Sequence, residues 1–509
     1  MSLGRTWTVT LTGLEGRVIE VEAHMSQGLP AFAVVGLPDA AVNEARERVR
    51  AAVHSSGVTW PPRRTTVNLS PASVRKTGTG LDLAVAVAVL TAAGLPDRER
   101  AGRAVHLGEL GLDGSLRPIA GVLPAVAAAV AAGRCEVVVP EANAEEARLV
   151  PGAEVRAVRH LGELVRSYGG EAHVPEAASS VLTAPPPPPR RAETDLADVR
   201  GQDEARFALE VAAAGGHHLS LLGPPGTGKS MLAARLPGLL PDLSESEAVE
   251  VSTVHSIAGT LRPQHGLMRR PPFESPHHTA TEPAIVGGGS GLPRPGVISR
   301  AHRGVLLLDE APEFKPTVLE CLRQPLENGE LILERSGGQA RYPARFQLVM
   351  TANPCPCGLA AGKGDRCTCS PNERRRYMRR LSGPLRDRVD IHVQVPPLTR
   401  ASLALSEEPE PSVAVAARVA RARERQRRRL AGTPWSTNAE VPGEWLRSSD
   451  RGLPNDIRTV LSRALERGAL SQRGLDRVLR VSWTLADLAG KDHPTIDEAG
   501  TALALRGSA

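Results

Sequence analysis

The chain has 509 residues, of which 41% are hydrophobic and only 3% aromatic, and its formal net charge is +6. This length exceeds a single core and predicts about three or four domains. The first residues lack the basic-then-apolar pattern of a secretion signal, and no stretch approaches the roughly 18 uncharged apolar residues of a membrane span. We therefore expect a cytoplasmic protein with no membrane partner. The positive charge permits a polyanionic partner, although an arginine-rich solvated surface gives the same sum.

Residues 1–180 alternate short runs of β pattern, such as FAVVGL and CEVVVP, with alanine-rich runs of helical pattern such as LDLAVAVAVLTAAG. This alternation predicts an α/β domain. Its phrases NLSPASVRKTGTGLDL and HLGELGLDGSLRPIAGVLPAV resemble the Lon protease-like (S5-type) domain. The resemblance places the serine and lysine of that protease family at Gly80 and Leu123, so both catalytic groups are missing. Ser73 and Lys76 lie nearby but not at those positions, and we expect a docking or DNA-guiding domain without peptidase activity.

A proline run, APPPPPRR, lies within residues 181–194. Consecutive prolines hold the backbone extended and donate no ladder hydrogen bonds, so we interpret the run as a semi-rigid linker. Recognition of the prolines by a partner protein is the alternative. The linker separates the N-terminal domain from an α/β core expected at residues 195–400, which a helical domain at residues 401–509 follows.

The segment GPPGTGKS, residues 223–230, fits the P-loop pattern G-x-x-x-x-G-K-[ST]. An apolar run before it predicts a strand, and MLAARLPGLL after it predicts a helix. Glycines let backbone N–H groups converge on a triphosphate, Lys229 would reach its β- and γ-phosphates, and Ser230 would hold the bridging Mg²⁺. We therefore expect ATP and Mg²⁺ as ligands. The predicted phosphate-binding residues are Gly223, Pro224, Pro225, Gly226, Thr227, Gly228, Lys229 and Ser230.

Further along, GVLLLDE reads as a buried strand that ends in two carboxylates. This Walker B pattern predicts that Asp309 coordinates Mg²⁺ and that Glu310 polarises the attacking water. A later run, RFQLVMTANP, predicts another strand with Asn353 at its carboxyl end, where the amide could orient that water. A plain turn-forming asparagine before Pro354 is the alternative.

These motifs together resemble the AAA+ ATPases of the magnesium-chelatase subunit I type and, within them, the ComM-like family. The match extends over almost the whole chain through VRGQDEARFALEVAAAGGHHLSLLGPPGTGKS, PHHTATEPAIVGGGSGLPRPGVISRAHRGVLLLDE, TANPCPCG and LSGPLRDRVDIHV. The resemblance implies a homo-oligomeric ring, expected to be a hexamer, with ATP between neighbouring subunits. It implies that Arg388, with Arg386 as the alternative, is the arginine finger for the neighbour's γ-phosphate. It also implies that Arg473 is the sensor-2 arginine of the lid, with an ordinary surface arginine as the alternative.

Two segments go beyond an ATP-binding core. Residues 329–347 read as two short strands around Ser336, Gly337 and Gly338, which predicts a hairpin. In a ring this hairpin could point into the pore, or it could be a solvated surface. The insert PHHTATEPAIVGGGSGLPRPG is by resemblance a second pore or interface loop, and a metal site at its histidine pair, His277 and His278, is a minor alternative.

The lid is expected to contain one helix over residues 412–432 and a helical set over residues 455–505. Five arginines recur at roughly helical spacing in the first of these: Arg418, Arg421, Arg425, Arg428 and Arg429. They could track phosphates, but the absence of interleaved aromatic residues favours a solvated lid face.

Four of the six cysteines fall in one short segment, CPCGLAAGKGDRCTC: Cys355, Cys357, Cys367 and Cys369. Four thiolates suit tetrahedral Zn²⁺, and the metal would be structural because protein fills every coordination position. The C-x-C spacing is tighter than the usual two-residue gap. Disulfides and unrelated free thiols are the alternatives.

The resemblance implies an ATP-driven ring motor on single-stranded or branched DNA, with helicase or branch-migration action in recombination or natural transformation. The alternative is a magnesium-chelatase-type subunit whose ATP hydrolysis drives metal insertion into a porphyrin. Such a subunit would need partner subunits and should lack the Lon-like N-terminal domain. An ATP-dependent protease would need the nucleophile and lysine that Gly80 and Leu123 replace.

Overall fold

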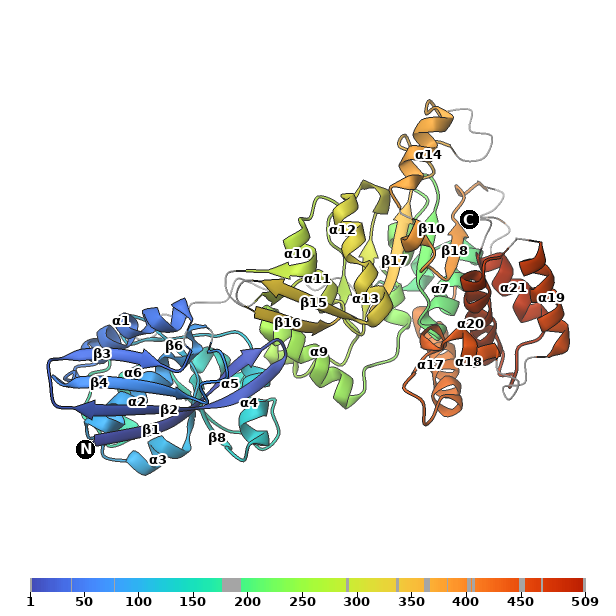
Figure 1. Ribbon diagram of the computed structural model, residues 1–509. Coiled ribbons are helices and arrows are strands. Elements are labelled where there is room, and N and C mark those ends of the chain that lie inside the picture. The colour runs from blue at the N-terminus through green and yellow to red at the C-terminus, as the bar shows by residue number, and fades with distance from the viewer. Residues whose placement is uncertain are drawn as a thin grey trace.

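The computed structural model describes residues 2–37, 39–76, 78–175, 194–289, 293–335, 338–360, 367–381, 383–400, 404, 408–447, 454–467 and 470–506. The chain forms an N-terminal α/β part, a central α/β core and a helical C-terminal part, in that order (Figure 1). The predicted proline linker lies outside the described residues, apart from Thr194. No described helix combines the length and apolar character needed to cross a bilayer.

The N-terminal part is built on a seven-stranded mixed sheet in the order β3-β4-β2-β1-β5-β8-β9. The predicted alternation of strands and helices is confirmed over the described residues of this part. The strands are β1 (Ser2–Thr12), β2 (Glu15–Ser26), β3 (Ala31–Val35), β4 (Arg64–Ser70), β5 (Val105–His106), β8 (Glu136–Pro140) and β9 (Glu154–Val158), with a separate pair β6 (Glu109–Leu110) and β7 (Leu116–Arg117). The helices are α1 (Ala40–Ser55), α2 (Asp82–Ala93), α3 (Arg98–Arg103), α4 (Val122–Ala131), α5 (Ala144–Ala147) and α6 (Leu161–Ser167).

Helix α2 explains how so few aromatic residues suffice for this core. Residues Asp82 to Ala92 are all buried, because the helix is apolar on nearly every face and packs against both β1 and β2. Its alanines and valines let the helix and the sheet approach closely. The one charged member, Asp82, is paired with Arg48 of α1 at 2.7 Å.

The core sheet is parallel, with five strands in the order β11-β14-β17-β10-β18. All residues of β14 and β17 are buried, as expected for strands covered on both faces. The strands are β10 (Leu219–Leu222), β11 (Phe273–Glu274), β14 (Val305–Leu308), β17 (Gln347–Ala352) and β18 (Ile391–Gln394). The helices are α7 (Asp203–Gly215), α8 (Lys229–Ala233), α9 (Glu245–Ala258), α10 (Glu282–Val286), α11 (Val297–Arg300), α12 (Pro316–Cys321), α13 (Arg323–Asn328), α14 (Pro371–Arg379) and α15 (Gly383–Arg386).

The helix after the P-loop is shorter than the sequence predicts. Helix α8 ends at Ala233, and a separate 3₁₀ turn, Leu236–Leu239, follows it. The break coincides with Pro237, whose ring nitrogen has no hydrogen to continue the helical pattern. The prediction of one helix over this stretch is therefore wrong in length.

The predicted hairpin is confirmed. Strands β15 (Glu330–Arg335) and β16 (Gly338–Pro343) pair antiparallel, and the residues at the turn, 336 and 337, lie outside the described residues. In the predicted insert, α10 leads into a second small pair, β12 (Gly287–Gly288) and β13 (Arg294–Pro295).

The C-terminal part is helical, as predicted, with α17 (Ser412–Arg429), α18 (Gly443–Arg447), α19 (Asn455–Glu466), α20 (Gln472–Leu488) and α21 (Ile496–Arg506). Helix α17 packs on both α7 and α20, so the helical part and the α/β core share one hydrophobic cluster. Four of the five arginines of α17 singled out above have carboxylate partners: Arg418, Arg425, Arg428 and Arg429. These ion pairs favour the structural interpretation of the stripe over phosphate tracking.

The N-terminal part contacts the core mainly through α4 and α9. The Ser256 hydroxyl donates to Glu146 Oε1 at 2.5 Å, and the backbone N–H of Gly121 donates to the Ser256 carbonyl at 3.1 Å. Glu146 also accepts a bond from the backbone of Leu123, and its burial raises its pKa. A buried carboxylate with these partners ties the two parts together.

Candidate functional site

The P-loop lies at the carboxyl end of the core sheet, directly after β10. Gly226 and Gly228 have φ values of 77° and 87°, a backbone conformation that other residues adopt only with strain. Gly223 passes so close to β18 that a Cβ there would stand 2.1 Å from the Val395 carbonyl oxygen. The glycines are therefore required by the shape of the loop.

Lys229 is held inside this loop. Its ammonium donates to the carbonyls of Gly223 at 2.7 Å and Pro224 at 2.8 Å, and to Asn353 Oδ1 at 3.1 Å. Burial lowers the pKa of Lys229, and the nearby carboxylates of Asp309 and Glu310 partly offset this effect. The predicted strand-end asparagine thus lies beside the P-loop lysine.

Asp309, at the end of β14, accepts hydrogen bonds from two hydroxyl groups. Its Oδ1 accepts from the Ser230 hydroxyl at 2.7 Å and from the Thr351 hydroxyl at 2.6 Å. Thr351 in turn accepts from the backbone N–H of Glu310 at 2.9 Å. Glu310 itself has φ 54° and an exposed side chain, so its carboxylate faces outward from the sheet edge.

The motifs in the sequence assign no role to Thr351. Its position on the buried strand β17, two residues before Asn353, would have been the signal. A hydroxyl there fixes both members of the acidic pair, since it bonds the side chain of Asp309 and the backbone of Glu310.

The groups at this edge fit a magnesium–nucleoside triphosphate. Ser230 and Asp309 supply the hard oxygen donors that Mg²⁺ prefers, and they already lie in contact with each other. The glycine-shaped loop and Lys229 supply donors for phosphate oxygens, and the Lys229 ammonium now bonds the loop's own carbonyls. When bound, Mg²⁺ would neutralise charge on the transferring phosphoryl group.

A second group of charges surrounds Arg388, at the turn between α15 and β18. Its guanidinium pairs with Glu327 of α13. Burial lowers the pKa of Arg388, and so do the positive charges of nearby arginines: Arg473, Arg323 and Arg477. The charge of Arg473 therefore acts on Arg388. The charges that act on Lys229 are different ones, those of Asp309 and Glu310. The alternative finger, Arg386, lies on α15, where its charge acts on His392.

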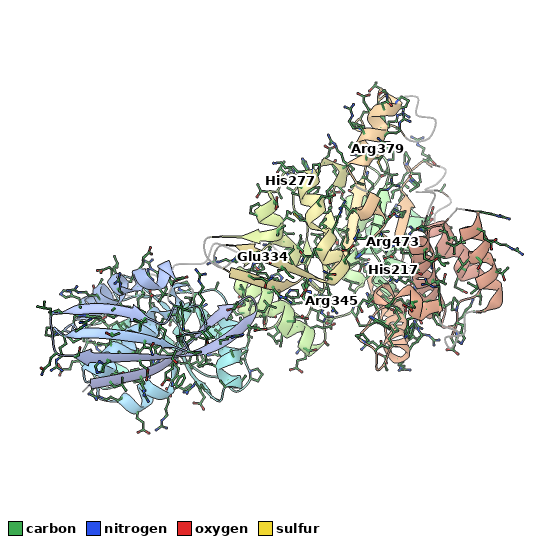
Figure 2. All side chains as sticks on the ribbon, in the orientation of Figure 1. His217, His277, Glu334, Arg345, Arg379 and Arg473 are labelled. Atoms are coloured by element: carbon green, nitrogen blue, oxygen red, sulfur yellow. The ribbon has the colours of Figure 1, made fainter. Side chains whose placement is uncertain are left out.

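A buried polar network joins the lid to the core sheet (Figure 2, at the labels His217 and Arg473). Asp390 accepts from Arg477 of α20 at 2.5 Å and lies 3.6 Å from the ring of His217. His217 is also bonded to Thr484 of α20 at 2.7 Å. Arg477 donates as well to the Arg388 carbonyl at 2.9 Å. The lid therefore fixes the backbone of the predicted arginine finger, a role that the sequence did not reveal.

The four clustered cysteines come together immediately beyond Asn353. Their sulfur atoms all lie within 4.8 Å of one another, and Cys355 is fully buried. The sulfur of Cys355 is 3.3 Å from that of Cys357 and 3.6 Å from that of Cys367. Tetrahedral Zn²⁺ with sulfur at about 2.3 Å needs sulfur–sulfur distances of about 3.8 Å, so this arrangement fits a zinc ion closely.

Among the described residues, the cysteines form the one group of three or more side chains placed to hold a metal. The rings of His277 and His278 lie 4.1 Å apart, and Nδ1 of His277 is bonded to the Thr279 hydroxyl. The histidine pair therefore has no third ligand among these residues, and the minor alternative of a metal there gains no support.

Gly80 and Leu123, the positions to which the Lon resemblance assigns a protease dyad, lie in ordinary structural positions. Gly80 is in a 3₁₀ turn, Thr79–Leu81. Leu123 lies on α4 and is 3% exposed. Lys76 is buried, with its ammonium donating to the Pro71 carbonyl, and burial lowers its pKa.

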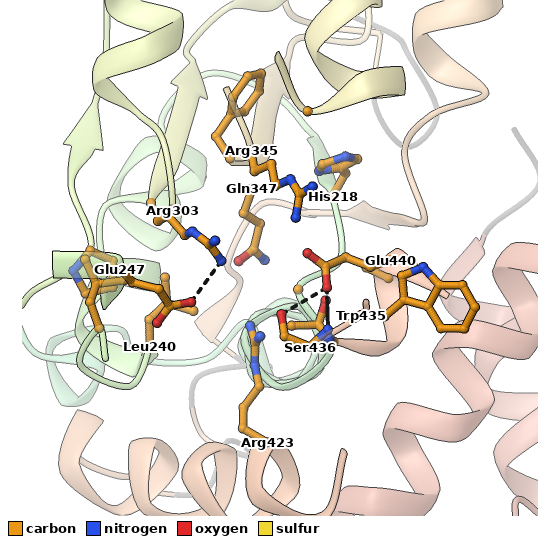
Figure 3. Close-up of a pocket in the computed structure, with 18 of the residues that line it drawn as sticks. His218, Leu240, Glu247, Arg303, Arg345, Gln347, Arg423, Trp435, Ser436 and Glu440 are labelled. Atoms are coloured by element: carbon orange, nitrogen blue, oxygen red, sulfur yellow. Dashed lines mark hydrogen bonds and ion pairs between the residues drawn. The ribbon is translucent and has the colours of Figure 1, made fainter. Parts of the chain in front are cut away.

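A cavity of about 560 Å³ opens at the opposite edge of the core sheet, between the core and the lid (Figure 3). It lies at the amino ends of β14 and β17, beside Gly304 and Gln347. One of its arginines, Arg303, is paired with Glu247 at 2.9 Å. The cavity is lined by none of the residues predicted to bind phosphate, which lie at the carboxyl edge of the sheet.

Comparison with known proteins gives matches along nearly the whole chain. The family described as magnesium chelatase, subunit ChlI, matches residues 195–403, its C-terminal family matches residues 409–506, and the family described as subunit ChlI of Mg-chelatase matches residues 21–143. An uncharacterized protein of Mycobacterium tuberculosis is 52% identical over 508 residues, or 99% of each chain. The competence protein ComM of Haemophilus influenzae is 40% identical over 493 residues, which are 97% of this chain and 95% of ComM. The magnesium-chelatase 38 kDa subunit of Rhodobacter capsulatus is 30% identical over 169 residues, which are 30% of this chain and 48% of that subunit.

Proposed function

Because the chain belongs to the ComM-like family of magnesium-chelatase subunit I-type AAA+ ATPases, we propose that it is an ATP-driven ring motor that acts on DNA. The observation that carries the ATPase part is the junction of Lys229 with Asn353 and of Ser230 with Asp309 at one sheet edge. The DNA part rests on the 40% identity to a competence protein over nearly the full length. The working unit would be a homo-oligomer, which we expect to be hexameric.

Four side chains would share the hydrolysis of ATP. Lys229 would exchange the carbonyls of Gly223 and Pro224 for the β- and γ-phosphates. Asp309 and Ser230 would hold Mg²⁺, while Thr351 keeps Asp309 in place. Glu310 would polarise the attacking water, and Asn353 would orient it.

The arginine pair completes the site from the neighbouring subunit. The positive charge of Arg473 acts on Arg388, whose guanidinium pairs with Glu327, so a phosphate anion that replaced this carboxylate would be stabilised by both arginines. The γ-phosphate of ATP in the adjacent subunit supplies such an anion. Arg388 would then act as the finger, and Arg473 would report the nucleotide state to the lid through α20.

The proposed domains are an N-terminal Lon protease-like domain at residues 1–180, a linker at 181–194, the AAA+ core at 195–400 and the lid at 401–509. The first of these would guide DNA or dock a partner and would have no peptidase activity, because Gly80 and Leu123 occupy the dyad positions. A chelatase role is the second candidate, and the chelatase subunit's match to only 30% of this chain disfavours it.

We also propose that Cys355, Cys357, Cys367 and Cys369 bind one structural Zn²⁺. Elemental analysis of protein purified without chelator should give about one zinc per chain. Protein with Cys367→Ser and Cys369→Ser together should contain none, while Cys135→Ser, remote from the group, should keep the metal. Wild-type protein without zinc, or a double variant with its full zinc content, would contradict the proposed zinc site.

The motor proposal is tested by branch migration of a synthetic four-way junction with purified protein. ATP should drive strand exchange, and a non-hydrolysable analogue should not. Magnesium insertion into a porphyrin in the presence of chelatase partner subunits, without any action on DNA, would favour the second candidate instead.

A further inference from the structure

Helix α14 stands out from the body of the core, beyond the end of β17 (Figure 1). The segment from Ser370 to Arg380 contains five arginines and one glutamate. That glutamate, Glu373, is already occupied, since it accepts bonds from the Ser370 hydroxyl and backbone N–H at the start of the helix. The projecting segment is therefore strongly cationic.

Two of the five arginines anchor the helix to the protein. The Arg374 guanidinium donates to the Cys369 carbonyl at 3.2 Å, which ties the helix to the cysteine group. Arg380 donates to the Pro312 carbonyl and to Glu313, both at 3.2 Å, just after the Walker B strand. The remaining three, Arg375, Arg376 and Arg379, are exposed, and Figure 2 shows Arg379 beside α14, away from the core.

The exposed face has the chemistry of a phosphate contact. Its one aromatic residue, Tyr377, is buried, and Met378 is half-buried, so the outer face offers almost no apolar surface. Protein–protein interfaces have apolar centres, whereas contacts to a nucleic-acid backbone are made by charged side chains on an otherwise polar surface. Without exposed aromatic residues the contact would be independent of base sequence.

The base of α14 is joined to the ATP site by several contacts. The turn that starts at Cys355 closes with the Gly358 N–H donating to the Cys355 carbonyl at 2.9 Å. Gly358 has φ 77° and presses on the P-loop, because a Cβ there would stand 2.5 Å from Pro225 Cδ. The cysteine turn thus lies directly against the loop that would hold the phosphates.

Tyr377 gives a second connection. It is 3% exposed, and Glu313, Glu310 and the backbone of Asn353 lie close enough to act electrostatically on its hydroxyl. Burial, followed by the charges of Glu313 and Glu310, raises the pKa of Tyr377, so the hydroxyl keeps its proton. A shift of α14 would therefore change the surroundings of both Asn353, the predicted water-orienting residue, and Glu310, the Walker B glutamate.

We propose that the exposed arginines of α14, Arg375, Arg376 and Arg379, contact the phosphates of a DNA strand, and that this contact stimulates ATP hydrolysis through Tyr377 and the cysteine turn. The inference rests on the proposed action on DNA. It adds the surface that holds the strand and the route from that surface to the P-loop.

The test compares wild-type protein with a triple variant, Arg375→Gln, Arg376→Gln and Arg379→Gln. The matched control removes three exposed arginines of the lid helix α17: Arg421→Gln, Arg427→Gln and Arg428→Gln. Binding of a labelled forked duplex is measured over a range of KCl concentrations, together with ATP turnover with and without that duplex. The triple variant should fall at least about tenfold in affinity, with a log–log salt slope smaller by about 2 to 3. Its turnover without DNA should equal that of wild type, and the control should match wild type throughout.

A third variant separates contact from coupling. Tyr377→Phe keeps the ring and loses the hydroxyl, so DNA affinity should be unchanged while stimulation by DNA falls several-fold. Replacing the three arginines by lysine should restore binding, because phosphate contact needs the charge and not the guanidinium shape.

The outcomes are distinct. If wild type binds DNA and the triple variant binds it equally well, this surface is wrong while the motor proposal stands. If the triple variant changes the oligomeric state in sedimentation, α14 contacts a second copy of the chain and the inference is overturned. If wild type neither binds DNA nor responds to it, the proposed function itself fails. Loss of affinity in Tyr377→Phe would refute the coupling route.

Discussion

The buried pair of Asp390 and Arg477 predicts how strongly the lid is held to the core. Asp390 is 3% exposed, accepts from Arg477 at 2.5 Å and receives the backbone N–H of His218 at 3.2 Å. In Asp390→Asn the Arg477 charge would remain buried without its carboxylate. Removing one partner of a buried ion pair costs about 3–5 kcal/mol.

The assay is urea unfolding followed by tryptophan fluorescence. Replacing Trp7 and Trp60 by phenylalanine leaves three tryptophans, Trp435, Trp445 and Trp483, all in the lid. With a urea m-value of about 3 kcal/mol/M, the midpoint of this transition should fall by about 1 to 1.7 M in the Asp390→Asn variant.

A matched control uses an exposed pair. Asp492 bonds Arg425 at 2.9 Å, but its side chain is 91% exposed, so Asp492→Asn should cost less than about 1 kcal/mol. Equal midpoints for the Asp390→Asn and Asp492→Asn variants would refute the reasoning that a buried charge pair fixes the lid.

The same pair predicts a pH dependence. Burial alone would raise the pKa of Asp390, but the Arg477 charge and the adjacent His217 ring outweigh it and hold the pKa well below its ordinary value. A depressed carboxyl pKa contributes stability above the unfolded-state pKa of about 3.9, and this contribution is lost as the pH falls. The difference between wild type and Asp390→Asn should therefore be constant above about pH 5 and narrow below about pH 4.

Three further predictions concern the nucleotide site. Lys229→Ala should weaken ATP binding in a fluorescent-nucleotide titration, whereas Glu310→Gln should keep binding and lower turnover by at least about 100-fold. Gly358→Ala should weaken ATP binding several-fold because its Cβ would push on the P-loop, while Gly490→Ala, with similar φ and open space, should not. Mixing inactive Arg388→Ala with inactive Glu310→Gln subunits should restore turnover in mixed rings, and failure at every ratio would count against a shared site.

Much of the core could be predicted because its signals are local. The P-loop, the strand that ends just before Asp309 and the hairpin of residues 330–343 each depend on short runs of sequence, and the structure contains all three. The predicted length of α8 is wrong because the apolar residues continue past Pro237, whereas the α-helical hydrogen bonding ends before it.

The connections between elements could not be predicted in the same way. Thr351 meets Asp309, and Arg477 meets Asp390, only after strands and helices far apart in sequence have packed together. No periodicity or spacing indicates such pairs. The cysteine group is intermediate, since its clustering is visible in the sequence but its contact with the P-loop through Gly358 is not.

The most direct test of an ATP-driven motor that acts on DNA is the ATP turnover of the purified full-length protein. It is measured with and without single-stranded or forked DNA, for wild type and for the Glu310→Gln variant. We expect magnesium-dependent hydrolysis that DNA increases several-fold, and no significant hydrolysis by the Glu310→Gln variant under either condition. Turnover that DNA leaves unchanged, or turnover by the variant at the wild-type rate, would contradict the account.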